Sequence, residues 1–151
     1  MAGENTIILK GRGVRKEGSA AAAITPGDLI ERTSTAGEIQ RHSTAGGNAA
    51  PSFAVENELV GNGIDVDYAA NDNVLFEHCE RGGEVQASVA AGAAAIVAGD
   101  YLESAGDGTL QKVATSASTS QADRAGVIAR ALEAVDNSGG GSKVRINVEI
   151  L

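Results

Sequence analysis

Aromatic residues are nearly absent from this sequence. Its 151 residues include two Phe, two Tyr and no Trp, although 42% of the chain is hydrophobic. The apolar residues are therefore mostly Ala, Val, Ile and Leu, which predicts a thin aliphatic core. A chain of this length forms one domain or two very small ones.

Long apolar runs are also missing. A membrane-spanning helix needs about 20 consecutive apolar residues. The most apolar stretch, residues 88–98, is about half as long as that requirement and contains Gly92. The first residues, 1–5, carry neither the basic nor the apolar region of a signal peptide. We therefore expect neither a signal peptide nor a membrane partner.

Positive charge is scarce as well. The chain has 20 acidic residues and 12 basic ones, for a net charge of −8. Its longest basic cluster, residues 12–16, is interrupted by Gly13 and Val14, and we interpret it as a solvated turn. Nucleic-acid-binding modules carry a basic patch, so we expect no direct contact with nucleic acid.

Cysteine and histidine are too few for most covalent or metal chemistry. Cys79 is the only cysteine, so the chain cannot form an internal disulfide. His78 precedes it, but neighbouring residues on a strand point to opposite faces and are poorly placed to share one ion. We expect Cys79 to be a small buried apolar residue.

Recognisable catalytic motifs are missing too. The sequence has no P-loop, no CxxC and no HExxH, and neither His42 nor His78 lies on a nucleophile elbow. Asp65 and Asp67, with the polar residues 71–73, could offer oxygen ligands to a weakly bound cation, but the ligand register of an EF-hand is missing. We expect no enzyme, no catalytic residue, no metal and no cofactor.

An internal repeat is the most informative feature of the sequence. Residues 20–31 match residues 92–103, and after a one-residue deletion residues 37–41 match residues 108–112. A weaker match pairs Ala54-Val55 with Val127-Ile128. Two copies, about 20–60 and 92–133, are too few for a solenoid. They predict a β-domain built from two related halves, in which Ile24 superposes on Ile96 and Asp28 on Asp100.

Each copy contains a Gly-Asp pair that follows an apolar run. Glycine supplies a positive φ angle, and aspartate can accept a hydrogen bond from its own backbone. The two matched aspartates could instead be catalytic, but their shared Gly-Asp context is better explained by turn chemistry. Asp107-Gly108 is a hairpin signal. We therefore assign six residues to structural turns: Gly27, Asp28, Gly99, Asp100, Asp107 and Gly108.

The rest of the chain also has the patterns of strands and loops. We expect an all-β fold, a small β-barrel or β-clip-like domain with long Gly/Ala/Ser loops and an extended N-terminal arm. Residues 1–19 would contain this arm and a first strand, with residues 1–5 and 11–19 mobile, and residues 20–151 would form a single β-domain. The predicted strands are 73–79, 85–89, 127–135 and 143–150, and the predicted long loops are 43–51 and 114–122.

Several of these segments together resemble a known family. The Ala-rich strand with its I-x-x-G-D turn, the return strand and the closing strands resemble the head decoration proteins of tailed viruses, also called capsid cement proteins. The resemblance covers residues 84–151 well and the first repeat less well. The same turn occurs in SAF domains and other β-clip modules. The segments that carry the resemblance are 93–103, 108–113, 126–135 and 144–150.

The resemblance implies a mechanical function. Such proteins bind the outside of an icosahedral head, commonly as homotrimers over local three-fold axes, and bridge subunits of the major capsid protein. By this resemblance the chain is expected on the outer surface of the virion head. An arm such as residues 1–8 could then add a strand to a capsid sheet. The alternatives are another structural virion module, associated with a tail or fibre, and a SAF-like β-clip binding domain.

Overall fold

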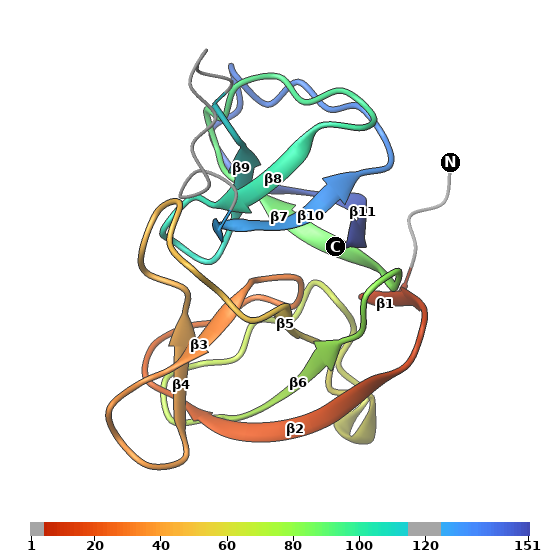
Figure 1. The fold of residues 1–151 in the computed structure, drawn as a ribbon. Coiled ribbons are helices and arrows are strands. Elements are labelled where there is room, and N and C mark those ends of the chain that lie inside the picture. Colours follow the sequence, from red (N-terminus) through yellow and green to blue (C-terminus); the bar gives the residue numbers. More distant parts are fainter. Residues whose placement is uncertain (1–4, 115–124) are drawn as a thin grey trace.

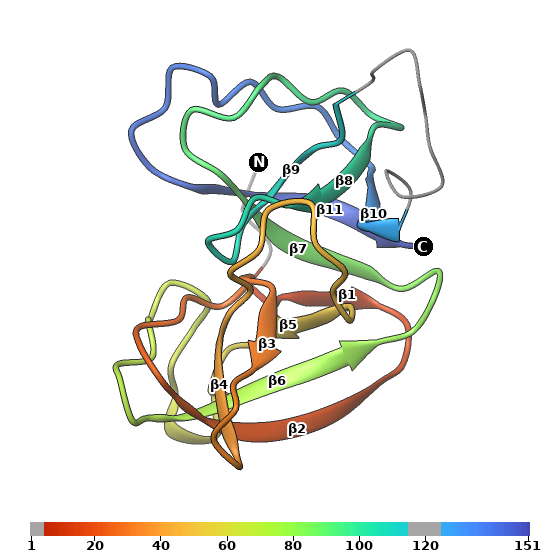
Figure 2. The same cartoon turned by 60° about the vertical axis from the view of Figure 1, so that its left-hand side comes forward.

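A computed structural model describes residues 5–114 and 125–151. Within these ranges the chain is all-β, apart from one short 3-10 helix, and none of its helices is long and apolar enough to cross a membrane. The chain folds into two stacked barrels, one above the other in Figure 1 and again in the rotated view of Figure 2. The expected all-β fold class is therefore confirmed. The predicted loop at 114–122 lies outside the described residues, except for Ala114.

The N-terminal barrel contains strands β2 to β6. Its strands are hydrogen-bonded in the order β3-β4-β2-β6-β5. A bridge between Leu29 and Phe53 joins the beginning of β3 to β5 and closes the ring. The bounds of its elements are β2 Gly13–Ala20, β3 Ile30–Arg32, β4 Glu38–Arg41, β5 Ser52–Ala54, η1 Glu58–Val60 and β6 Asn73–Cys79.

The C-terminal barrel contains strands β7 to β11, in the order β7-β11-β10-β8-β9. A parallel pairing of Val89 with Leu110 links β9 back to β7 and closes this ring. Strand β1 adds to the free side of β7. The bounds are β1 Ile8–Lys10, β7 Glu84–Val89, β8 Tyr101–Ser104, β9 Leu110–Lys112, β10 Val127–Ala131 and β11 Val144–Ile150.

The two barrels have the same topology. In each, the first strand pairs parallel with the third (β2 with β4, β7 with β9) and antiparallel with the last (β2 with β6, β7 with β11). The second and third strands form an antiparallel hairpin in each barrel. The fourth strand lies beside the last in each. The expectation of two related halves is therefore correct, and the repeat covers more of the chain than residues 20–60 and 92–133.

The weaker part of the sequence alignment was out of register. Gly27 N–H donates to Ala54 O at 2.8 Å, and Gly99 N–H donates to Ala131 O at 2.8 Å. Ala54 is therefore equivalent to Ala131, and not to Val127 as the sequence suggested. The segment between β9 and β10 has more residues than the segment between β4 and β5, which accounts for the shift in register.

The N-terminal arm is shorter than expected. Residues 13–20 form β2, which pairs with β6 along most of its length, so the predicted boundary after residue 19 cuts a strand. Ile7 is buried and its N–H donates to Glu56 Oε2 at 3.1 Å, and Ile8 pairs with Val85 of the C-terminal barrel. Residues 7 and 8 of the arm are therefore bound to the rest of the same chain. The predicted mobility of residues 11–19 was wrong, because most of them belong to β2.

The core is aliphatic and forms two clusters. A small cluster fills the N-terminal barrel, around Ile24, Ile39 and Phe76. The larger one fills the C-terminal barrel and continues across the junction to Leu29 and Phe53 on the outer side of the N-terminal barrel. The two barrels therefore share one hydrophobic interface.

Candidate functional site

The two Gly-Asp turns have matching geometry. Gly27 and Gly99 have φ angles of 98° and 94°, the left-handed region in which a side chain is strained. Asp28 Oδ2 accepts a hydrogen bond from the backbone N–H of Thr25 at 3.0 Å. Asp100 Oδ2 accepts the equivalent bond from Val97 at 2.9 Å. The same local turn is therefore built twice.

The surroundings of the two turns differ. Asp28 is fully buried, and Lys143 Nζ lies 2.8 Å from its Oδ1. Lys143 belongs to the C-terminal barrel, so this ion pair ties the two barrels together. Asp100 is partly exposed and pairs with Lys112 of its own barrel at 2.9 Å. The hydrogen bond from the Val97 backbone and the pairing with Lys112 lower the pKa of Asp100.

The Asp107-Gly108 turn also lies at the junction. Asp107 Oδ1 accepts from the Thr109 N–H at 3.0 Å, as in a self-bonded aspartate turn. Gly108 has a φ of 83°. Its carbonyl accepts from the Leu29 N–H at 2.7 Å, and its own N–H donates to His42 O at 3.0 Å.

A short segment of the N-terminal barrel lies between two parts of the C-terminal barrel, which explains these contacts. In the N-terminal barrel the Ser19 N–H donates to Gly37 O at 2.9 Å, within the ring. Ser88, which occupies the place of Ser19 in β7, donates instead to Gly27 O at 3.0 Å. The segment around Gly27 therefore enters between β7 and Gly108. Of the six predicted turn residues, four lie in the two turns that meet at the junction: Gly27, Asp28, Asp107 and Gly108. Gly99 and Asp100 lie apart from it.

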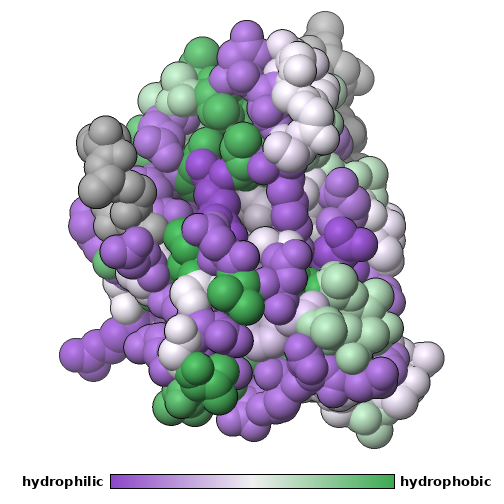
Figure 3. Space-filling view, turned by 180° about the vertical axis from the view of Figure 1, so that it is seen from behind, coloured by the Kyte–Doolittle hydropathy of each residue, from purple (hydrophilic) through white to green (hydrophobic). Residues whose placement is uncertain are grey.

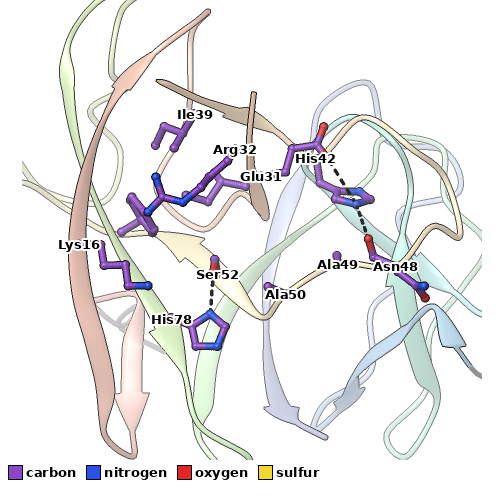
Figure 4. Close-up of a pocket in the computed structure, with 12 residues that line it drawn as sticks. Lys16, Glu31, Arg32, Ile39, His42, Asn48, Ala49, Ala50, Ser52 and His78 are labelled. Atoms are coloured by element: carbon purple, nitrogen blue, oxygen red, sulfur yellow. Dashed lines mark hydrogen bonds and ion pairs between the residues drawn. The ribbon is translucent and has the colours of Figure 1, made fainter. Parts of the chain in front are cut away.

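A groove of about 310 Å³ opens at one end of the N-terminal barrel (Figure 4). Both histidines of the chain line it, although they are 36 residues apart and share no sequence motif. His78 Nδ1 lies 3.0 Å from Ser52 Oγ. No carboxylate forms an ion pair with His78 in the described part of the chain. The Ser52–His78 pair therefore lacks the acidic residue that orients the histidine of a catalytic triad.

His42 is a buried linking residue. Its Nε2 lies 3.2 Å from the Asn48 carbonyl, which can only accept, so Nε2 carries a proton. Its Nδ1 lies 2.7 Å from Ser104 Oγ, which belongs to the C-terminal barrel. Glu31 Oε2 lies 3.6 Å from Nε2. His42 therefore joins the β3-β4 hairpin to β8, which is a structural role.

The groove is cationic at its outer side. Lys16 and Arg32 line it and are exposed, and Arg32 lies over the ring of Phe76, 5.9 Å from its centre. The equivalent of Lys16 in the C-terminal barrel is Val85, because Lys16 pairs with Phe76 where Val85 pairs with Val148. The exposed Lys16 is therefore replaced in the C-terminal barrel by a buried aliphatic residue.

Two further expectations concern Cys79 and a cation site. Cys79 is buried, and burial, with the nearby Glu77 carboxylate, raises the pKa of its thiol to about 12. Within residues 5–114 and 125–151, no group of three or more His, Cys, Asp or Glu side chains is placed to hold a metal ion. The polar residues at 65–73 therefore do not form such a site there.

Exposed apolar side chains form several separate patches. Figure 3, which shows the side opposite to Figure 1, has hydrophobic residues scattered among hydrophilic ones. Large hydrophobic residues with a third or more of their surface exposed occur in both barrels: Val14, Leu59, Val60, Val66, Val97, Tyr101, Leu132 and Leu151.

Comparison with known proteins identifies a similar fold. No protein-family model matches the sequence, and no curated protein matches it. Among solved structures, the crystal structure of the N base of head fibre gp8.5 of bacteriophage phi29 is similar to this chain, with a TM-score of 0.59 and 15% sequence identity. The match covers 93% of this chain and 95% of that one. The whole two-barrel arrangement, and not only one barrel, is therefore a fold found in a solved structure.

Proposed function

We propose that this chain is a structural protein of a tailed-virus head, attached to the outer surface of the capsid. The observation that carries the proposal is the fold match to a phage head fibre base, which extends over nearly all of both chains. The sequence resemblance to head decoration proteins supports the same class independently, since it depends on the turn and strand motifs. In this proposal the chain is not an enzyme.

The finer proposal is that the protein stabilises the head. As homotrimers over local three-fold axes, it would bridge neighbouring subunits of the major capsid protein. Its core is mostly aliphatic, with Phe53, Tyr68 and Phe76 as the buried aromatic residues. A partner that binds only the folded state adds to its stability by mass action, so attachment to a capsid would stabilise this protein as well as the head.

The test compares decorated heads with heads from which this protein has been removed. We expect decorated heads to retain their DNA to a higher temperature, and adding the purified protein back to restore that temperature. Equal release temperatures would contradict the stabilising role. Failure of the purified protein to sediment with stripped heads would contradict attachment itself.

A second candidate function is the base of a head fibre. The similar solved structure is named as the N base of such a fibre, which favours this alternative. Electron microscopy of virions distinguishes the two functions. A fibre projecting outward from the position of this chain would identify a base, and a compact density lying flat between capsid subunits would identify a decoration protein.

A further inference from the structure

The two barrels present equivalent outer faces, and hydrogen bonds show which residues correspond. The Val55 N–H donates to Leu75 O at 2.9 Å, and the Leu132 N–H donates to Asn147 O at 2.9 Å. Leu132 is therefore the equivalent of Val55. The residue after each Gly-Asp pair gives a second equivalence, Leu29 with Tyr101. The end of the last strand gives a third, Cys79 with Leu151.

In the N-terminal barrel this face is completely covered. Leu29 and Val55 have no exposed surface, and Cys79 retains 6%. All three belong to the hydrophobic cluster that continues into the C-terminal barrel. The C-terminal barrel, which has the same topology, therefore covers this face.

In the C-terminal barrel the equivalent face is open. Tyr101 is 55% exposed, Leu132 39% and Leu151 37%. In the strand register, Arg130 of β10 lies opposite Tyr101 of β8 on one side and opposite Glu149 of β11 on the other. These three residues therefore form a row across β8, β10 and β11. Leu132 lies two residues beyond Arg130, and Leu151 two residues beyond Glu149, on the same side of their strands. We call these five residues the open face.

The charges of the open face favour a second copy of the chain over a strongly charged partner. Arg130 Nη2 lies 2.7 Å from Glu149 Oε2, so the row contains one positive and one negative charge that neutralise each other. Two chains of net charge −8 repel, and they approach most easily where opposed surfaces are neutral. Across a contact between copies, Arg130 and Glu149 of one chain can also pair with Glu149 and Arg130 of the other, as a self-complementary surface requires.

We propose that the open face is a self-association surface, covered by a second copy of this chain. The intramolecular junction shows that a barrel of this topology can cover such a face. Apolar residues occupy three equivalent positions in both barrels, while Arg130 stands at the place of Phe53 and Asn147 at the place of Leu75. An isologous contact of this kind joins two copies, so it is separate from the three-fold contact of the proposed homotrimer, which joins two different surfaces. It does not require attachment to a capsid, so it can fail while the proposed function holds.

The test measures the mass of the purified full chain over a wide concentration range by analytical ultracentrifugation. We expect the wild-type chain to associate. Tyr101→Asp and Leu132→Asp each place a charge on the open face, and we expect each to weaken association by about 30-fold or more, as for a central contact residue. Leu59→Asp is the matched control, since Leu59 is 85% exposed and lies in η1 of the other barrel.

Three results would overturn the proposal. The first is a wild-type chain that stays monomeric at every concentration. The second is unchanged association of both open-face variants. The third is an equal loss of association in the Leu59→Asp variant, which would mean that added charge disrupts contacts anywhere. Thermal unfolding of each variant establishes that it is folded, and sedimentation with stripped heads measures the proposed capsid attachment separately.

Discussion

The ion pair between Asp28 and Lys143 predicts that equivalent aspartates contribute unequally to stability. Asp28 and Asp100 accept the same turn hydrogen bond, at 3.0 and 2.9 Å, and each pairs with a lysine. The Asp28 side chain has no exposed surface, whereas that of Asp100 retains 17% and lies in a turn open to solvent. We therefore expect Asp28→Ala to destabilise the protein much more than Asp100→Ala.

The magnitudes follow from what each substitution leaves behind. Losing one partner of a buried ion pair costs about 3–5 kcal/mol when the other charge stays buried. Lys143 is 30% exposed and can turn to water, so Asp28→Ala should cost about 3 kcal/mol, near the lower end of that range. Lys143→Met leaves the Asp28 carboxylate buried without its partner and should lower the free energy of unfolding by about 4 kcal/mol. Asp100→Ala loses a turn hydrogen bond and a surface pair, about 1 kcal/mol.

Urea unfolding followed by far-UV circular dichroism measures these differences, since the chain has no Trp for fluorescence. In a thermal scan the Asp28→Ala variant should melt on the order of 10 °C lower, and the Asp100→Ala variant about 3 °C lower. Lys112→Met serves as the control for Lys143→Met. Equal losses of stability in Asp28→Ala and Asp100→Ala would refute this reasoning, in which the first turn joins the two barrels and the second only shapes its own loop.

Three further predictions concern single groups. Gly27→Ala should destabilise more than Gly99→Ala in urea unfolding, because a Cβ at Gly27 would lie 3.0 Å from a backbone oxygen, whereas the space at Gly99 is open and only its φ is strained. Cys79 should resist alkylation at pH 8 until the protein unfolds, because its thiol is buried with a pKa near 12, and rapid labelling of the native protein would contradict this. The lowered pKa of Asp100 adds stability that is fully present above its ordinary value of 3.8 and is lost as the pH falls through the lower folded value, so Asp100→Asn should flatten this part of the stability–pH curve.

Local turn chemistry and clear alternation could be predicted from the sequence. The Gly-Asp turns depend on residues three apart. Strand β11 alternates apolar and polar residues, and β6 contains a short apolar run that is buried on both sides. Strand β2 could not be recognised in this way. Its first five residues are all exposed, so neither of its faces carries an apolar pattern there, and it is held by hydrogen bonds to β6.

Contacts between the barrels could not be predicted, because they join residues that are distant in sequence. Lys143 is 115 residues from Asp28, and nothing in the local sequence of either distinguishes this pair from the one at Asp100. The groove at the end of the N-terminal barrel was missed for the same reason. His42 follows β4 and His78 belongs to β6, and only the closed ring brings both to one opening.

Comparison of the two barrels locates where duplicated halves have diverged. At the junction, Leu29 and Val55 are buried, while the equivalent Tyr101 and Leu132 are exposed and still large. An outer face that meets only water gains nothing from such side chains, and in a chain this acidic, charged residues would keep copies apart more effectively. The groove shows the opposite change, since Lys16 stands where the C-terminal barrel has Val85. Lys16 is thus a polar residue where the N-terminal barrel meets solvent, whereas Tyr101 and Leu132 are large exposed side chains for which a partner is expected.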